Sequence, residues 1–236
     1  MSKNINYFPK ENSPTVYYLK NSAKFGWGEK KSLDRERQDL LDKYVYGKKV
    51  LDIGCGIGLY VDYLAKGGMD AYGVDFVDEF IISAKKTKKG TFIKGQAENL
   101  PFAQSQFDTV ILFNILEHGD DLAILKEAIR IVRKRILVIV PKVVDETLEK
   151  SGVVFRHYLD KSHSKEYIEE DLRIFAKELN LKLIKLKKVH PLYNETIFAA
   201  LFEGSLFFKK LIRKLVFAFL PKKIYPTEIF AVFEKR

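Results

Sequence analysis

The sequence has very little cysteine, tryptophan and methionine. Its 236 residues include one cysteine, Cys55, one tryptophan and two methionines. A single cysteine excludes an internal disulfide framework, a multi-cysteine metal site and an iron–sulfur cluster. No apolar segment typical of a secretory signal occurs in the opening stretch MSKNINYFPKENS. We therefore expect a protein of a reducing compartment, with a cytoplasmic location.

The composition is that of a folded, basic protein. Hydrophobic residues make up 47% and aromatic residues 13%, which excludes a disordered chain and allows a sizeable core. The net charge is +10, and residues 181–236 contain 12 Lys or Arg against four Asp or Glu. Such a basic surface suits nucleic acid, anionic lipid or an acidic small molecule, but it is equally typical of a solvated face.

Hydrophobic patterning predicts strands that alternate with helices, and therefore an α/β fold with a doubly wound, mainly parallel sheet. Ser32 is expected to cap the first helix of the domain. The predicted strands are 49–53, 70–74, 91–94, 109–113, 135–141, 182–189 and 228–236, and the predicted helices are 32–46, 59–66, 122–133 and 165–179.

A glycine-rich turn follows the first strand in the segment VLDIGCGIG. Gly54, Gly56 and Gly58 let backbone N–H groups approach a ligand that a Cβ atom would block. The dinucleotide pattern G-x-G-x-x-G needs another glycine where this chain has Leu59, which disfavours a nicotinamide-dependent oxidoreductase. Asp52 precedes the turn, where a carboxylate can attract a cationic amino group.

Asp75 ends the second strand, and its carboxylate can accept hydrogen bonds from two ribose hydroxyls. The alternative is a cap for a helix that begins near Phe76. Two further segments follow predicted strands: GQAENLPF at 95–102 and FDTVILFNILEH at 107–118.

Together these four segments resemble the S-adenosylmethionine (SAM) site of class I methyltransferases, most closely the group called type 11, which includes ubiquinone-biosynthesis methyltransferases. The resemblance covers about residues 45–145. It implies a Rossmann-like, seven-stranded sheet of order 3-2-1-4-5-7-6 with the last strand antiparallel. It also implies SAM as the cofactor and S-adenosylhomocysteine as the product. The cofactor-binding residues expected on this basis are Asp52, Gly54, Gly56, Gly58, Asp75, Phe76, Gln96, Ala97, Glu98, Asn114 and Ile115.

Within the resemblance, Gln96 and Ala97 match positions that contact adenine, and Asn114 and Ile115 match positions that line the methionine part. The family usually has Asp where this chain has Gln96, whose amide oxygen can still accept from the adenine amine. A second departure is VRKRI at 132–136, where relatives often carry a Pro-Gly-Gly turn. We expect this departure to alter only a distal loop.

Methyl transfer is an in-line displacement, so alignment of the acceptor supplies much of the acceleration, and a hydroxyl acceptor usually also needs a base. The catalytic candidates are His118 and His163, with Glu117 beside the first of them and His157 in the same loop as the second. For His118 the alternative is simple packing. No metal-binding residues are assigned. The residues FNIL after the fourth strand lack the motif for amino methylation of adenine or glutamine.

The expected organisation is an N-terminal arm or lid, 1–31, followed by one domain, 32–236, with a helical insertion at about 190–226. Within the insertion, 198–220 is amphipathic and either caps the acceptor pocket or contacts a membrane surface. The arm and the insertion are expected to close over the acceptor side of the cofactor. The arm's bulky aromatic residues are Tyr17, Tyr18, Phe25 and Trp27.

The function expected from these observations is SAM-dependent methyl transfer to a small-molecule or lipid-like acceptor, at oxygen. The alternatives are an RNA methyltransferase, a nicotinamide-dependent oxidoreductase and a non-catalytic interaction protein with the same fold. No motif in the sequence identifies the acceptor or the oligomeric state.

Overall fold

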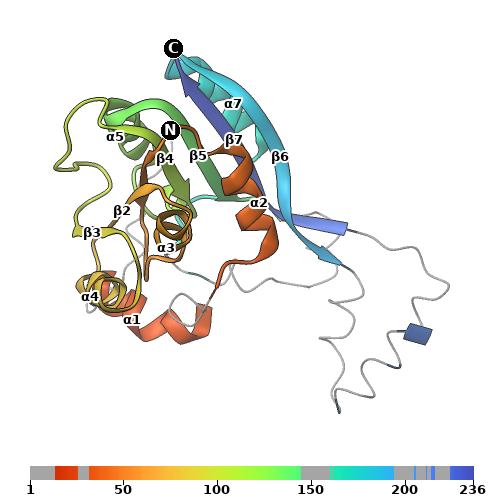
Figure 1. Cartoon of the computed structure of the whole chain (residues 1–236). Helices are drawn as coiled ribbons and strands as arrows, with labels where there is room; N and C mark the ends of the chain where they lie inside the picture. Colours follow the sequence, from red (N-terminus) through yellow and green to blue (C-terminus); the bar gives the residue numbers. More distant parts are fainter. Residues whose placement is uncertain are drawn as a thin grey trace.

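The structure is a computed structural model that describes residues 14–25, 32–144, 160, 162–193, 205, 211, 214–215 and 224–236. A central sheet is covered by helices on both faces (Figure 1). Its strands are β1 (Lys49–Ile53), β2 (Asp70–Asp75), β3 (Thr91–Lys94), β4 (Phe107–Phe113), β5 (Val132–Pro141), β6 (Leu181–Tyr193) and β7 (Ile224–Lys235). The helices are α1 (Pro14–Phe25), α2 (Arg35–Tyr44), α3 (Leu59–Lys66), α4 (Asp78–Thr87), α5 (Asp121–Ile131) and α7 (Glu169–Glu178), with a short 3-10 helix η1 (Leu116–His118).

The strand order is β3-β2-β1-β4-β5-β7-β6, which confirms the expected order. β1 pairs in parallel with both β2 and β4, and β7 pairs antiparallel with β5 and β6. The order therefore reverses between β1 and β4. Ligands of open α/β sheets bind beyond the carboxyl ends of the strands at such a reversal.

The strands of the sheet centre are apolar on both faces because helices cover both. In β1, Leu51 and Ile53 belong to the core cluster with α5 and α7, while Val50 belongs to the cluster with α2, α3 and α4. Successive residues of a strand point to opposite faces, so a strand between two helical layers reads as a continuous apolar run. This explains why the sequence locates the central strands well.

Two helix starts differ from the sequence-based expectation. The cap of α2 is Asp34, whose side chain accepts a hydrogen bond from Arg37 N at 2.9 Å, so the assignment of the cap to Ser32 is wrong. Helix α7 begins at Glu169 and not near residue 165. The preceding Tyr167 is extended, because its backbone N–H donates to Pro141 O at 2.9 Å and its ring is fully buried.

Strand boundaries differ at two places. Val132, expected within a helix, begins β5 and pairs with Phe107, so VRKRI is strand and not a distal loop. Val132 is β-branched and fully buried, which favours a strand. β6 and β7 pair as far as Tyr193 and Ile224. Most of the expected insertion, including nearly all of 198–220, lies outside the described residues, as do His157 and Trp27.

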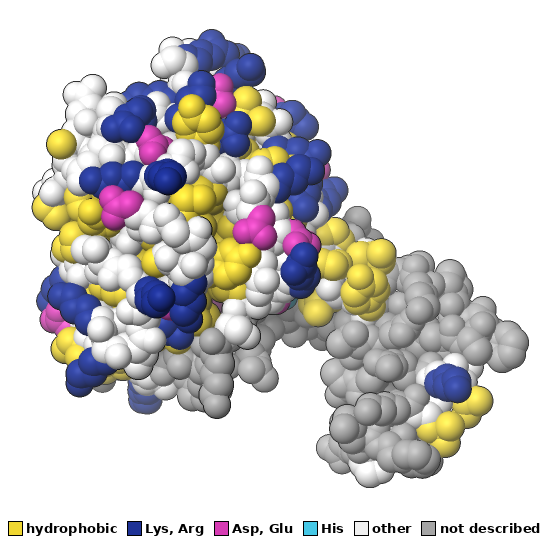
Figure 2. Space-filling view, viewed as in Figure 1, with side chains coloured by type: hydrophobic (Ala, Val, Ile, Leu, Met, Phe, Trp, Pro, Cys, Tyr) yellow, Lys and Arg dark blue, Asp and Glu magenta, His cyan; other side chains and the backbone are white. Residues whose placement is uncertain are grey.

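The basic residues form no single patch on the visible face. Lys and Arg side chains are spread over the described body, with Asp and Glu between them (Figure 2). None of the described helices has the length and apolarity that crossing a membrane requires.

The capping of α2 gives a direct test of the corrected helix start. Asp34→Ala removes the acceptor for Arg37 N, and we expect it to lower the free energy of unfolding by about 1 kcal/mol. The exposed Ser32 makes no cap, so Ser32→Ala serves as the matched control, with an expected change within about 0.5 kcal/mol. Urea denaturation measures both variants. Equal losses of unfolding free energy in the two variants would contradict the assignment of the cap to Asp34.

Candidate functional site

A cavity of about 600 Å³ opens at the carboxyl ends of β1, β2 and β4. Its wall combines the turns after these strands with residues from α1, α2 and the ends of β5 and β7. It therefore lies at the reversal of strand order, where a ligand is expected. The sequence-predicted residues on its wall are Gly54, Gly56, Asp75, Phe76, Gln96, Ala97, Glu98, Asn114, Ile115, His118 and His163.

Two predicted cofactor residues are not on this wall. Gly58 begins α3 at φ +79°, and a Cβ atom there would lie 2.4 Å from the Phe92 ring and 3.2 Å from Ala84. Position 58 therefore requires glycine because of its close packing against Phe92 and Ala84. Asp52 is 1% exposed and sits within the sheet, so this geometry does not support a direct contact with a cofactor amino group.

The turn after β1 is held by backbone hydrogen bonds. Gly54 N and Cys55 N both donate to Val74 O, at 2.8 and 2.9 Å. Gly56 follows at φ +50°, a left-handed conformation, and an added Cβ would meet nothing within 4 Å. The backbone at Gly56 therefore borders open space within the cavity.

Asp75 connects the turn after β1 with the turn after β2. Its carboxylate accepts from Gly56 N at 2.8 Å through one oxygen and from Val77 N at 2.9 Å through the other. Burial raises the pKa of Asp75, and the two N–H donors partly offset this effect. Asp75 thus lies on the cavity wall, whereas α4 begins at Asp78 with Val77 as its cap, so Asp75 is not the helix cap that the sequence offered as the alternative.

An ion pair that the sequence did not reveal closes the other side of the cavity. The Arg37 guanidinium, on α2, binds the Glu228 carboxylate, on β7, and both lie on the wall. Asn114 Nδ2 donates to the same carboxylate at 3.3 Å. The pairing with Glu228 outweighs burial and raises the pKa of Arg37, whose Nη1 has no hydrogen-bond partner among the described residues.

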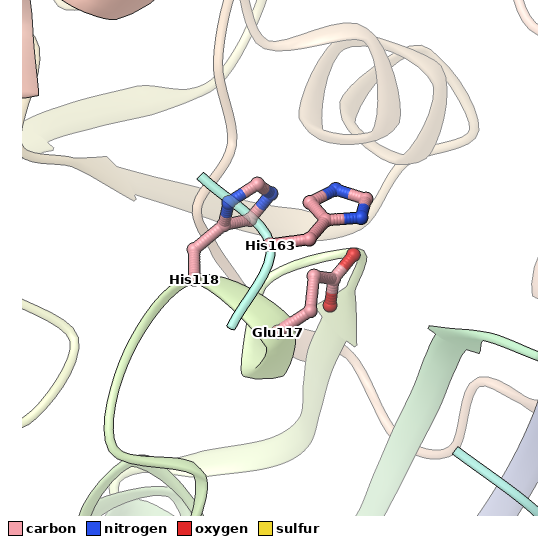
Figure 3. Close-up of side chains that lie close together, drawn as sticks. All are labelled: Glu117, His118 and His163. Carbon is pink, nitrogen blue, oxygen red and sulfur yellow. The ribbon is translucent and has the colours of Figure 1, made fainter. Parts of the chain in front are cut away.

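Glu117, His118 and His163 lie close together on the wall (Figure 3). Glu117 and His118 come from η1, and the 162–164 segment brings His163 over them because Ser164 N donates to Glu117 O at 2.8 Å. Glu117 is fully buried, and neither carboxylate oxygen has a partner among the described residues. Burial raises the pKa of Glu117 to about 8 and lowers the pKa of His118 to about 3.

A buried carboxylate orients the two histidines. Ser162 Oγ donates to Asp160 Oδ1 at 2.6 Å and lies 2.9 Å from His118 Nδ1. Because the only hydroxyl proton of Ser162 goes to Asp160, we infer that His118 Nδ1 carries a proton and donates to Ser162. His163 Nε2 lies 3.6 Å from the other oxygen of Asp160.

Helix α1 of the N-terminal arm reaches the same cluster. The Tyr17 hydroxyl donates to Asp160 Oδ1 at 2.8 Å, and the Tyr18 hydroxyl lies 3.0 Å from His118 Nδ1. Tyr18 also lines the cavity. A lid function for the arm stays a prediction, as do the cofactor and catalytic roles of the site residues.

Sequence reasoning missed the residues that no local motif marks. Arg37 lies in a charged helix segment, RERQDLL, where basic residues are ordinary, and Glu228 opens a predicted strand. Asp160 and Ser162 lie in a segment without clear periodicity. For Asp160 and Ser162 the available signal was their place beside His163, which the sequence already indicates as a candidate.

The strand order and the place of the cavity are those of the class I SAM-dependent methyltransferase fold. Residues 51–140 match the model of the type 11 family, which is described as a methyltransferase domain. A SAM-dependent methyltransferase structure from Archaeoglobus fulgidus has the same fold, with a TM-score of 0.66 at 20% identity, over 93% of this chain and 100% of that one.

Two curated relatives match part of the chain. A demethylmenaquinone methyltransferase from Thermotoga maritima is 32% identical over 117 residues, 48% of this chain and 51% of that protein. A ubiquinone biosynthesis O-methyltransferase from Azorhizobium caulinodans is 35% identical over 83 residues, 33% of each protein. The chain thus spans about half the length of the first relative and a third of the second.

The different surroundings of two glycines give a stability test. Gly56→Ala should cost only the left-handed strain of about 1–2 kcal/mol, because the added methyl meets no atom. Gly58→Ala carries the same strain and also collides with Phe92, so we expect a larger loss of unfolding free energy. Denaturant unfolding of the two variants measures the difference. A Gly56→Ala variant that is less stable than Gly58→Ala would contradict the geometry.

Asp52 gives a test of pH dependence. Burial, and secondarily the Asp75 charge, raise the pKa of Asp52 well above its usual range, and one of its oxygens has no partner among the described residues. Above the unfolded pKa of about 3.9 the unfolded chain releases this proton while the native state keeps it, so stability falls as pH rises.

We expect Asp52→Asn to remove this fall. The difference in unfolding free energy between Asp52→Asn and the native sequence should shift in favour of the variant as the pH rises from about 4 to 7. Below about pH 4 this difference should stay constant. Urea denaturation across this range measures the change. A difference that shrinks as pH rises would show that Asp52 is stabilised as the anion.

Proposed function

We propose that this protein is a SAM-dependent methyltransferase that transfers a methyl group to an oxygen of a small-molecule acceptor. The observation that carries the proposal is the convergence of Gly56, Asp75 and Asn114 on one cavity at the reversal of strand order. The relatives' names support quinone-type acceptors, one of them methylated at oxygen.

The residues present fit an adenosyl cofactor. A volume of about 600 Å³ is in the range of small-molecule sites, which run from about 300 to 1,000 Å³. Gly56 leaves open the space that a side chain would fill. The Asp75 carboxylate offers about four lone-pair directions and uses two of them for Gly56 and Val77, which leaves acceptor capacity for two ribose hydroxyls.

Other wall residues have roles that follow from their chemistry. Gln96 can accept from the adenine amine through its amide oxygen, beside Ala97. Asn114, at φ +54°, turns the chain after β4 and places Ile115 against Gly54, which shapes the methionine end. Arg37 Nη1, buried without a partner among the described residues, suits a methionine carboxylate.

Bound SAM supplies the electrophilic methyl group. The chain contributes binding, orientation and exclusion of water, which are the main sources of acceleration for an in-line displacement. Tyr18 forms part of the wall that would separate the reacting atoms from solvent. A base role for His118 or His163 stays a prediction.

Ligand binding by Asp75 variants tests the proposal. We expect SAM and S-adenosylhomocysteine to bind in titration calorimetry and NAD not to bind. Asp75→Ala should weaken SAM binding by about 1.5–3 kcal/mol, the range for hydrogen bonds to a charged group. Gly56→Val should weaken it further, because its side chain would occupy the cofactor space.

Asp78→Ala is the matched control, because Asp78 is an exposed carboxylate three residues away that lies outside the cavity wall. It should bind SAM as the native sequence does. Binding of NAD instead of SAM would overturn the proposed function. Unchanged SAM affinity in a folded Asp75→Ala variant would overturn the ribose assignment.

A further inference from the structure

We propose that Glu117, His118 and His163 form a binding site for a divalent transition-metal ion on the wall of the cavity. The proposal concerns the metal alone and does not depend on methyl transfer. It goes beyond the sequence-based expectation, which assigned no metal residues.

The first observation is the grouping of ligand atoms. One carboxylate oxygen of Glu117 and one ring nitrogen from each histidine lie within 4.8 Å of one another. The three side chains converge from two segments of the chain, η1 and the 162–164 segment (Figure 3). Zinc bonds of about 2.0–2.1 Å would place tetrahedral donors about 3.4 Å apart, so small side-chain rotations would close the site.

The second observation is that the donor atoms are buried without partners. Both oxygens of Glu117 and Nδ1 of His163 have no hydrogen-bond partner among the described residues. A buried, unpaired carboxylate is costly, and buried charged groups are usually paired or bind metals. A metal ion bound by one Glu117 oxygen and by Nδ1 of His163 would give both buried side chains a partner.

The third observation is the support behind the histidines. Metal-binding histidines usually donate their other ring N–H to a carboxylate, a carbonyl or water, which fixes the tautomer. His118 Nδ1 lies 2.9 Å from Ser162 Oγ, which donates to Asp160, and the tautomer with a proton on Nδ1 would leave the lone pair of His118 on Nε2. His163 Nε2 faces the other oxygen of Asp160, which leaves Nδ1 for the metal.

The donor set indicates the class of metal. Two imidazoles and one carboxylate suit zinc and its neighbours and not magnesium, which prefers oxygen ligands. Three protein ligands leave a coordination position open toward the cavity, as in catalytic zinc sites. A metal there would act as a Lewis acid on an oxygen bound at that position. The two histidines then act as ligands and not as the base predicted from the sequence.

Zinc binding to the full-length, chelator-treated protein tests the site. We expect one equivalent of Zn²⁺ to bind in competition titrations, Co²⁺ to give a visible absorption spectrum of low-coordinate cobalt, and Mg²⁺ not to compete. Glu117→Gln and, separately, His163→Gln should weaken Zn²⁺ binding by more than about 100-fold, and Asp160→Asn by about 10–100-fold.

His190→Asn is the matched control, because His190 is an exposed histidine of the same cavity wall that does not belong to the three-residue group, and it has a positive φ that asparagine tolerates. It should bind Zn²⁺ as the native sequence does. Thermal unfolding checks that every variant is folded. If Glu117→Gln does not fold, the His163→Gln variant decides the result.

These measurements distinguish a failure of the metal site from a failure of the proposed function. Native Zn²⁺ affinity in folded Glu117→Gln or His163→Gln, or no stoichiometric binding by the native sequence, would overturn the metal site. S-adenosylhomocysteine binding by the native sequence is measured alongside as a separate readout. Loss of that binding in the native sequence would overturn the methyltransferase proposal and leave the metal site standing.

Discussion

The Asp75 carboxylate is the contact on which the shape of the site depends. It accepts one hydrogen bond from the turn after β1 and one from the turn after β2, so it fixes two loops that no other side chain joins in this way among the described residues. Burial opposes the charged form, and the two N–H donors favour it. The residue proposed to recognise ribose is therefore also the residue that shapes the cavity, and its two roles share one geometry.

The cavity as a whole favours cations. Arg37 is the only Lys or Arg on the wall among the described residues, and it is already paired with Glu228. The acidic wall residues are Asp34, Asp75, Glu98, Glu117, Asp160 and Glu228. Burial raises the pKa of Asp52 and of Glu117, and the charges of Asp75 and Glu228, respectively, add to these increases. Such a wall suits the sulfonium and ammonium groups of SAM, and next to Glu117 it suits a metal ion.

The parts of the structure that the sequence predicts are the parts set by local signals. The central strands are apolar runs ended by Gly54, Asp75 and Asn114, and each of these residues lies where the pattern places it. The two corrected helix starts have different causes: the cap at Asp34 is a local contact with Arg37 N, whereas the extended Tyr167 depends on its hydrogen bond to Pro141 at the end of β5. Arg37 and Glu228 meet only because α2 packs near the end of β7, a long-range contact that one sequence does not encode visibly.

The cavity wall has two halves, which are formed by different parts of the chain. The half proposed to hold the cofactor is formed by consecutive β-strand ends, so its residues are close in sequence and recur as a motif. The other half combines Tyr18 from α1, His163 from a distant segment and Glu228 from the last strand. Contacts of this kind can change without disturbing the sheet, whereas the strand-end turns are fixed by the sheet itself. Acceptor specificity is then expected to reside in the second half, where this chain has its histidine and carboxylate cluster.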